Sequence, residues 1–285
     1  MSVRPVARRS RAPLPGRRTR PVRRASAGLS AVRAGAALGM LASAAAIYGV
    51  GQSSAFDYAK LQVNDLQFTD QAVVEATLAG VRGRNLFGLS TGPLQAVLET
   101  LATVERARVD VHLPATLTVT IDERVPALIW QVGARRYLVD SDGALFALLA
   151  GDPPPPKAAG LPVVDDRRAA SAGLSVGLRL DAVDLDAATR LASLVPPDVG
   201  SAAVSLAVVV TDENGFMIQT NPKGWSAVFG FYTPSLRTTE LIPGQVRLLR
   251  SLLAGREPLV ERVILASATD GVYVPRATPK ASQAP

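Results

Sequence analysis

The chain has 285 residues, of which 48% are hydrophobic, so it is long and apolar enough for one or two domains with packed cores. It contains no cysteine, which excludes a disulfide framework, a thiolate metal site and a cysteine nucleophile. The formal net charge of +7 would suggest a nucleic-acid-binding protein. However, residues 1–56 hold ten arginines and no acidic residue, whereas residues 57–285 hold 21 basic and 24 acidic residues. Because only the N-terminal segment is basic, we predict no nucleic acid among the partners.

The N-terminal segment divides into a basic tail and an uncharged stretch. Residues 1–33 are rich in arginine and proline, and we expect a disordered cytoplasmic tail that contacts anionic lipid. Residues 34–56 carry no charge and are long enough, as a helix, to span the hydrocarbon core of a bilayer. The arginines before this stretch and Asp57 after it predict a single-pass membrane protein with its body outside the cytoplasm.

Two other interpretations of the uncharged stretch stay open. Its alanine and glycine content makes it less hydrophobic than a leucine-rich span, and Ser53, Ser54 and Ala55 are small enough for a signal-peptide cleavage site. A disordered tail on a soluble protein is the other reading. The basic segment is unusually long for a signal peptide, so we favour a retained signal anchor.

Residues 57–126 show the order β-α-α-β-β. Residues 60–68 are predicted as a short strand, and Thr69 or Asp70 is predicted to cap the helix that follows. A second helix follows a glycine-containing turn. Two alternating apolar stretches then flank Pro114, which predicts two strands joined by a tight turn.

The order and spacing of residues in this segment resemble the POTRA domain of the FtsQ/DivIB family of cell-division proteins. The residues that carry the resemblance are Gly83, Asn85, Leu86, Phe87, Leu101, Val104, Ala107, Val109, Leu113, Pro114, Leu117, Val119, Ile121, Glu123, Arg124 and Pro126. Several also have a plain structural role. We expect the Asn-Leu-Phe residues to pack a loop under the sheet, and Val104 and Ala107 to hold the second helix on the strands.

Residues 127–275 are predicted as a mostly antiparallel β domain with two packed helices, which gives the chain an α+β fold. One helix is expected to begin at Asp184 or Asp186, and the other to cover residues 239–254. Residues 140–143, Asp-Ser-Asp-Gly, imitate the start of a calcium loop but lack the later ligands, so we interpret them as a turn. Trp130 and the hairpin after it match the first β hairpin of the family. Residues 276–285 are expected to be a flexible tail.

The sequence gives no sign of catalysis. It has no nucleophile–base pair, phosphate-binding glycine loop or carboxylate pair in a recognisable signature. The single histidine, His112, lies in an alternating strand without companions at ligand spacing. We therefore predict no catalytic, cofactor-binding or metal-binding residues, no small-molecule substrate, and a protein that is not an enzyme.

The family resemblance implies a non-catalytic scaffold of the division apparatus at the septum. Such a protein links early and late division proteins and helps control septal peptidoglycan synthesis. Its partners would be membrane proteins of the FtsB/FtsL type and the septal peptidoglycan synthase complex. The alternative is a POTRA-bearing secretion or envelope assembly factor, although those usually carry tandem POTRA units or a membrane β-barrel.

The mechanism that we predict for partner binding is strand addition to an exposed edge of the β domain. The last strand is the candidate edge, with apolar anchors beside it. The candidate residues are Val272, Tyr273 and Val274 for the ladder, and Trp225, Phe231 and Tyr232 for the anchors. The competing interpretation places these anchor aromatics in the core of the sheet, and the sequence does not separate the two.

Overall fold

The computed structural model describes residues 31–149, 151 and 154–277, and the chain divides into two units between Gln52 and Ser53. The first unit contains one helix, α1 (Ala31–Gly51). Among the described helices, α1 is the one long and apolar enough to cross a membrane. The basic tail predicted for residues 1–33 and the C-terminal tail lie mostly outside the described residues.

The end of α1 differs from the predicted span of residues 34–56. The helix stops at Gly51, and the chain then forms a separate 3₁₀ turn, Ser54–Phe56. The Ser53 hydroxyl accepts the Ala55 N–H, which caps this turn and separates it from the helix. Phe56 belongs to the folded body, where its ring packs edge-on against Phe87 with the centroids 4.8 Å apart.

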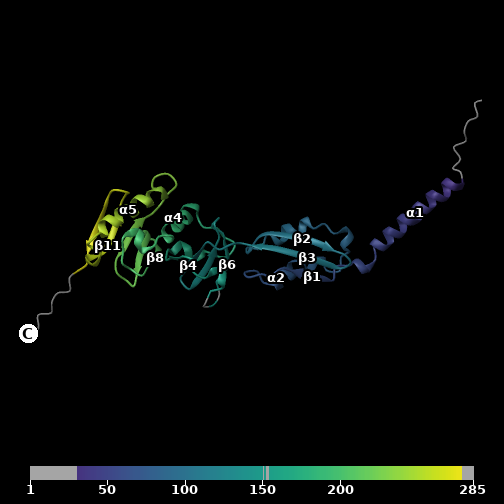
Figure 1. Cartoon of the computed structure of the whole chain (residues 1–285), viewed down its shortest axis with the longest axis horizontal. Helices are drawn as coiled ribbons and strands as arrows, with labels where there is room; N and C mark the ends of the chain where they lie inside the picture. The colour runs from purple at the N-terminus through teal and green to yellow at the C-terminus, as the bar shows by residue number, and fades with distance from the viewer. Residues whose placement is uncertain (1–30, 150, 152–153, 278–285) are drawn as a thin grey trace, which may run out of the picture. The chain divides into compact units, whose positions relative to one another are not determined.

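The first part of the body has the predicted β-α-α-β-β order (Figure 1). Its elements are β1 (Lys60–Val63), α2 (Gln71–Thr77), α3 (Gly92–Leu98), β2 (Val104–His112) and β3 (Thr116–Glu123). In the sheet, β3 lies between β1, to which it is parallel, and β2, to which it is antiparallel. Alternate side chains of β2 and β3 share one apolar core with α2 and α3, so a single layer of helices covers one face of the sheet.

Strand β1 ends at Val63, earlier than the predicted residue 68, because the Asn64 side chain binds both the N–H and the carbonyl of Ile121 in β3. The carboxylate of Glu123 then binds the segment that follows. This carboxylate accepts the backbone N–H groups of Gln67, Phe68 and Thr69 at 2.7–2.8 Å. Those N–H groups are therefore not available for a strand ladder. Burial alone would raise the pKa of Glu123, but the three N–H donors hold it below the ordinary value.

We expect the substitution Glu123→Gln to lower the free energy of unfolding by about 2 kcal/mol at neutral pH, because an amide replaces a charged acceptor of three N–H groups. A carboxylate with a lowered folded pKa contributes stability above its unfolded pKa and loses it as the pH falls through the folded value. The variant should therefore lose less stability on acidification than the wild type. Urea unfolding from neutral to acidic pH measures both effects. Glu105→Gln, at an exposed position of β2, is the control, and equal effects of the two variants would contradict the role of Glu123.

Arg124, the next residue of the motif, joins this domain to the β domain. Its Nη1 lies 2.7 Å from Oδ2 of Asp140, and its Nε donates to the carbonyl of Ala102 at 3.0 Å. The other oxygen of Asp140 accepts the N–H groups of Asp142 and Ala144, and thereby forms the turn between two strands. One oxygen of the Asp140 carboxylate thus binds the Arg124 guanidinium, and the other binds the N–H groups of the turn. This confirms the turn predicted for residues 140–143.

The β domain is a nine-stranded sheet with the order β12-β11-β10-β9-β8-β7-β4-β5-β6 (Figure 1). Its strands are β4 (Leu128–Val132), β5 (Arg135–Val139), β6 (Leu145–Leu148), β7 (Val163–Asp166), β8 (Ser205–Thr211), β9 (Gly215–Asn221), β10 (Ser226–Gly230), β11 (Val260–Leu265) and β12 (Gly271–Pro275). Five of the eight strand pairings are antiparallel. The pairs β4·β7, β7·β8 and β10·β11 are parallel, so the sheet is mixed but mostly antiparallel.

Two helices, α4 (Ala182–Ala192) and α5 (Ile242–Leu253), pack on one face of this sheet and share its main core. Helix α4 begins before the predicted Asp184 or Asp186, because Asp181 caps it by accepting the Val183 N–H at 2.8 Å. Asp184 and Asp186 lie inside the helix and form ion pairs with arginines instead. A smaller apolar cluster covers the opposite face at β4, β5 and β6.

Candidate functional site

The last strand, β12, forms one end of the nine-stranded sheet, and among the described residues it pairs only with β11. Its side chains are apolar and open to solvent: Val272 is 59% exposed, Tyr273 40% and Val274 41%. The strand at the other end of the sheet, β6, is different. Its first residue, Leu145, exchanges backbone hydrogen bonds with Gly177 and Leu178, which cover the start of that edge. Strand β12 therefore presents an apolar edge that no described residue covers, of the kind that natural sheets usually protect.

The backbone of β12 presents hydrogen-bonding groups to the open side. The Arg276 N–H donates to the carbonyl of Leu259, at 2.7 Å, and so points toward β11. Because backbone direction alternates along an antiparallel strand, Val274 and Val272 also face β11. It follows that the N–H and C=O of Tyr273 point away from the sheet. Pro275 shares this outward direction but has no N–H, so it limits the open edge at its C-terminal end.

Buried polar side chains fix the strands that carry this edge. The Gln245 amide donates to the carbonyls of Phe229 and Leu265, at the ends of β10 and β11, with both distances 3.1 Å. The Tyr232 hydroxyl in turn donates to the Gln245 carbonyl oxygen at 2.8 Å. Burial raises the pKa of Tyr232, so its hydroxyl stays protonated and remains a donor. Helix α5 thus locks the ends of β10 and β11, on which β12 depends.

The surroundings of the edge combine an aromatic ring with cations. The guanidinium of Arg256 lies 5.9 Å from the centroid of the Tyr273 ring. A shallow hollow of about 450 Å³ adjoins the strand, and its lining includes Lys223, Glu261, Arg262 and Val274. The edge therefore offers main-chain bonds, an apolar strip and nearby positive charge to a partner.

The predicted anchor residues separate into one exposed and two buried side chains. Phe231 is 50% exposed, but Trp225 and Tyr232 are buried. The indole N–H of Trp225 donates to Glu257 at 2.9 Å, and Tyr232 holds Gln245. These two aromatics are buried, as in the core interpretation, and the polar group of each already has an internal partner. Trp225 also lines the hollow beside β12.

Some residues of the POTRA signature are buried, whereas others are exposed. Leu86 and Val104 are buried in the core, and the Asn85 side chain accepts the Phe87 N–H at 2.9 Å, which caps a 3₁₀ turn. Phe87 itself is 58% exposed, so the expectation that all three Asn-Leu-Phe residues pack under the sheet is wrong for the phenylalanine. Leu113 is exposed as well, in the turn between β2 and β3.

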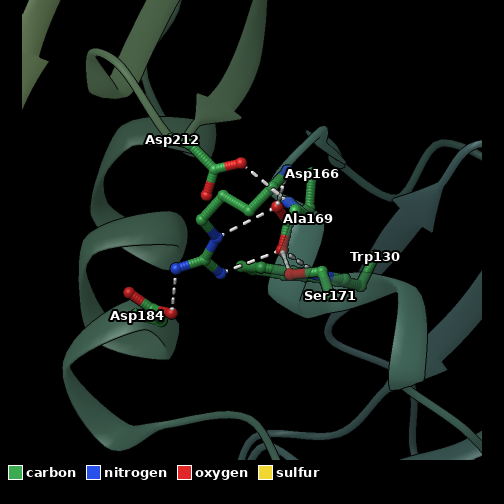
Figure 2. A network of polar contacts seen from close by, with 7 residues as sticks. Trp130, Asp166, Ala169, Ser171, Asp184 and Asp212 are labelled. Carbon is green, nitrogen blue, oxygen red and sulfur yellow. Dashed lines mark hydrogen bonds and ion pairs between the residues drawn. The ribbon is translucent and has the colours of Figure 1, made fainter.

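A second polar cluster is centred on Asp166 in β7 and was not predicted from the sequence (Figure 2). The Asp166 carboxylate is fully buried and accepts hydrogen bonds from the Trp130 indole, from Ser171 and from Arg168. The other side of the Arg168 guanidinium contacts Asp184 at 2.7 Å. The arrangement combines a serine with carboxylates, but its carboxylate is enclosed and saturated with internal donors. It is a structural network rather than a reactive site.

The comparisons with known proteins agree with this architecture. The family described as "POTRA domain, FtsQ-type" matches residues 56–124. The chain is 32% identical to cell division protein FtsQ of Mycobacteroides abscessus over 142 residues, which is 48% of this chain and 43% of that protein. It is 32% identical to cell division protein FtsQ of Chloroflexus aurantiacus over 157 residues, 54% of each chain. The chain thus spans about half the length of the curated relatives it matches. The chain therefore contains an FtsQ-type POTRA domain and is similar over about half its length to proteins named cell division protein FtsQ, in agreement with the resemblance to the FtsQ/DivIB family.

Proposed function

We propose that the chain is a non-catalytic scaffold of the division septum, which links early and late cell-division proteins and helps control septal peptidoglycan synthesis. The observation that carries this proposal is the open edge of β12, since an uncovered strand accepts a partner strand through main-chain hydrogen bonds. The similarity to proteins named cell division protein FtsQ supports the division role. In this role the chain acts through contacts and needs no cofactor.

The partners in this proposal are membrane proteins of the FtsB/FtsL type, and through them the septal peptidoglycan synthase complex. A strand that pairs with β12 would place alternate side chains beside Val272 and Val274 on one face and beside Tyr273 on the other. The exposed valines favour apolar residues in the first set. The cations near the edge, Arg256 and Arg262, favour acidic residues next to the added strand.

The proposed topology places the N-terminus in the cytoplasm and the body outside it. The arginines of residues 1–33 precede α1 and Asp57 follows it, which is the asymmetry that the positive-inside rule describes. The body would then meet its partners in the extracytoplasmic space at the cell membrane.

The test is the location of the full chain, fused at its N-terminus to a fluorescent protein, in growing cells. We expect a band at midcell, and we expect protease added to spheroplasts to digest the body. A fusion that carries residues 1–56 alone is the control, and it should spread evenly around the membrane because it lacks the β domain.

The outcomes separate the parts of the proposal. An even peripheral signal from the full chain would contradict the septal role and favour a secretion or envelope assembly factor. A body protected from protease in intact spheroplasts would contradict the topology, whatever the fluorescence pattern.

A further inference from the structure

Two loops of the POTRA domain lie at the point where the body follows α1. The Tyr58 N–H donates to the carbonyl of Arg84 at 2.8 Å, and the Gly83 N–H donates to that of Tyr58 at 3.0 Å. The Asn85 side chain reaches further back and donates to the carbonyl of Ser53 at 3.3 Å. Only Gln52 separates Ser53 from the last residue of α1, so the loop of residues 82–88 is tied within a few residues of the helix end.

The β2–β3 turn belongs to the same end of the domain. The carbonyl of Ala115 accepts the N–H groups of both Ala59 and Lys60, which start β1. This turn exposes Leu113. The loops of residues 82–88 and 112–116 therefore flank the segment that leaves the helix.

The side chains at this end have the character of a membrane interface. Phe87 is 58% exposed and stacks edge-on against Phe56, which precedes β1. Residues 56–60, 82–88 and 112–116 together hold three Lys or Arg residues and a single acidic one. The cations are Lys60, Arg82 and Arg84, all exposed. Aromatic rings and flanking cations are the side chains that settle at the level of lipid headgroups.

We infer that this end of the POTRA domain is a second membrane contact, in which Phe87 enters the interfacial layer while Arg82 and Arg84 bind anionic lipid headgroups. The inference rests on the proposal that α1 spans the membrane. It explains why the motif residue Phe87 stays outside the core while its neighbour Leu86 is buried. Such a contact would hold the base of the POTRA domain against the bilayer.

The test is spin labelling of the full chain in nanodiscs that contain phosphatidylglycerol, without any other protein. The chain has no native cysteine, so a single cysteine can be introduced without background. Gly88→Cys is suitable because a Cβ at Gly88 meets no atom within 4 Å and because Phe87 is retained. We expect a nitroxide at position 88 to be reached better by oxygen than by a water-soluble nickel chelate. The control is Val125→Cys, an exposed position after β3 at the opposite end of the domain, which should favour the chelate.

Two further variants, made in the Gly88→Cys background, test the side chains. Phe87→Ala should lower the ratio of oxygen to nickel accessibility at position 88 several-fold, whereas Val97→Ala, an exposed apolar control in α3, should not. Replacing phosphatidylglycerol by phosphatidylcholine should also lower the ratio. The double variant Arg82→Gln/Arg84→Gln should remove this dependence on lipid charge.

Failure of this inference is distinguishable from failure of the membrane span. A label at position 88 as accessible to nickel as one at position 125 would overturn the inference. A third label, in Met40→Cys, reports on α1 itself and should lie deep in the lipid. If that label were accessible to nickel, the proposal that α1 spans the membrane would be wrong. The inferred contact of residues 82–88 with lipid would then be wrong as well.

Discussion

Replacing Asp166 by alanine is expected to lower the free energy of unfolding of the β domain by about 3 kcal/mol. The carboxylate is fully buried and accepts hydrogen bonds from Trp130, Arg168 and Ser171. Its removal leaves the indole N–H and part of the guanidinium without an acceptor in the core. The cost falls at the lower end of the range for buried ion pairs because Arg168 keeps its contact with Asp184.

The neighbouring acid, Asp165, supplies a matched control. It also forms an ion pair, with Arg167, but both side chains are partly exposed. Asp165→Ala should therefore cost less than about 1 kcal/mol. Urea unfolding of the full chain in detergent compares the two variants, and similar losses would mean that the buried network contributes little to stability.

The same network predicts a dependence on pH. Burial alone would raise the pKa of Asp166, but the hydrogen bonds from Arg168 and Ser171 hold it below the ordinary value. A lowered folded pKa means that the contribution of Asp166 is complete above the unfolded pKa and is lost as the pH falls through the folded one. The difference in stability between wild type and Asp166→Ala should shrink on acidification.

The POTRA domain was predictable because its signals are local. Period-two alternation in β2 and β3, and apolar spacing in the two helices, lie in neighbouring stretches of sequence. The cap at Asp70 belongs to the same kind of signal, since it binds the Ala72 N–H two residues later. The predicted end of β1 was wrong, because the residues that bind the chain after Val63, Ile121 and Glu123, lie more than fifty residues away.

The β domain shows the same limit more clearly. Its hairpins were predictable, but the parallel pairs β4·β7 and β10·β11 join segments separated by other elements. Local patterns do not specify such pairings. Trp225 and Tyr232 likewise have hydrogen-bond partners, Glu257 and Gln245, that belong to other segments of the chain. Residue type alone therefore did not show whether these two aromatics lie in the core or at the surface.

The edge strand was predicted as a strand because Val272, Tyr273 and Val274 are β-prone, but its place in the sheet required the topology. Strand β12 follows β11 in a hairpin, and β10, not β12, covers the other side of β11. The direction of the Tyr273 N–H follows from the bond between Arg276 and Leu259, which no sequence pattern indicates.

Because the Tyr273 N–H points away from the sheet, the substitution Tyr273→Pro is the second change for which we expect a large effect. It should weaken binding of an added partner strand about tenfold or more. Proline removes the outward N–H, and loss of one hydrogen bond at a desolvated edge corresponds to roughly 1.5 kcal/mol. The proline ring also projects into the space that the partner backbone would occupy. The substitution leaves the bonds between β12 and β11 in place, because Val272 and Val274 make them, and the POTRA domain should stay folded.

Two control variants separate the backbone from the side chain. Tyr273→Val keeps the N–H and the strand preference but removes the ring above which Arg256 lies, so it should retain most of the affinity. Ala277→Pro introduces a proline just after β12, at an exposed position outside the ladder, and should bind like the wild type. The assay is co-purification of the full chain with its proposed partners, the FtsB/FtsL-type proteins of the same cell.

Hydrogen exchange at the Tyr273 amide gives a direct readout of the same event. In the free chain this N–H faces solvent on an uncovered edge and should exchange rapidly, whereas in the complex a partner carbonyl should protect it. The N–H of Leu145, on the covered edge at β6, donates to Leu178 and should be unchanged by the partner. If the partner bound the Tyr273→Pro variant as tightly as the wild type, with no protection at position 273 in the wild-type complex, strand addition at β12 would be wrong. The partner would then have to bind another surface of the body.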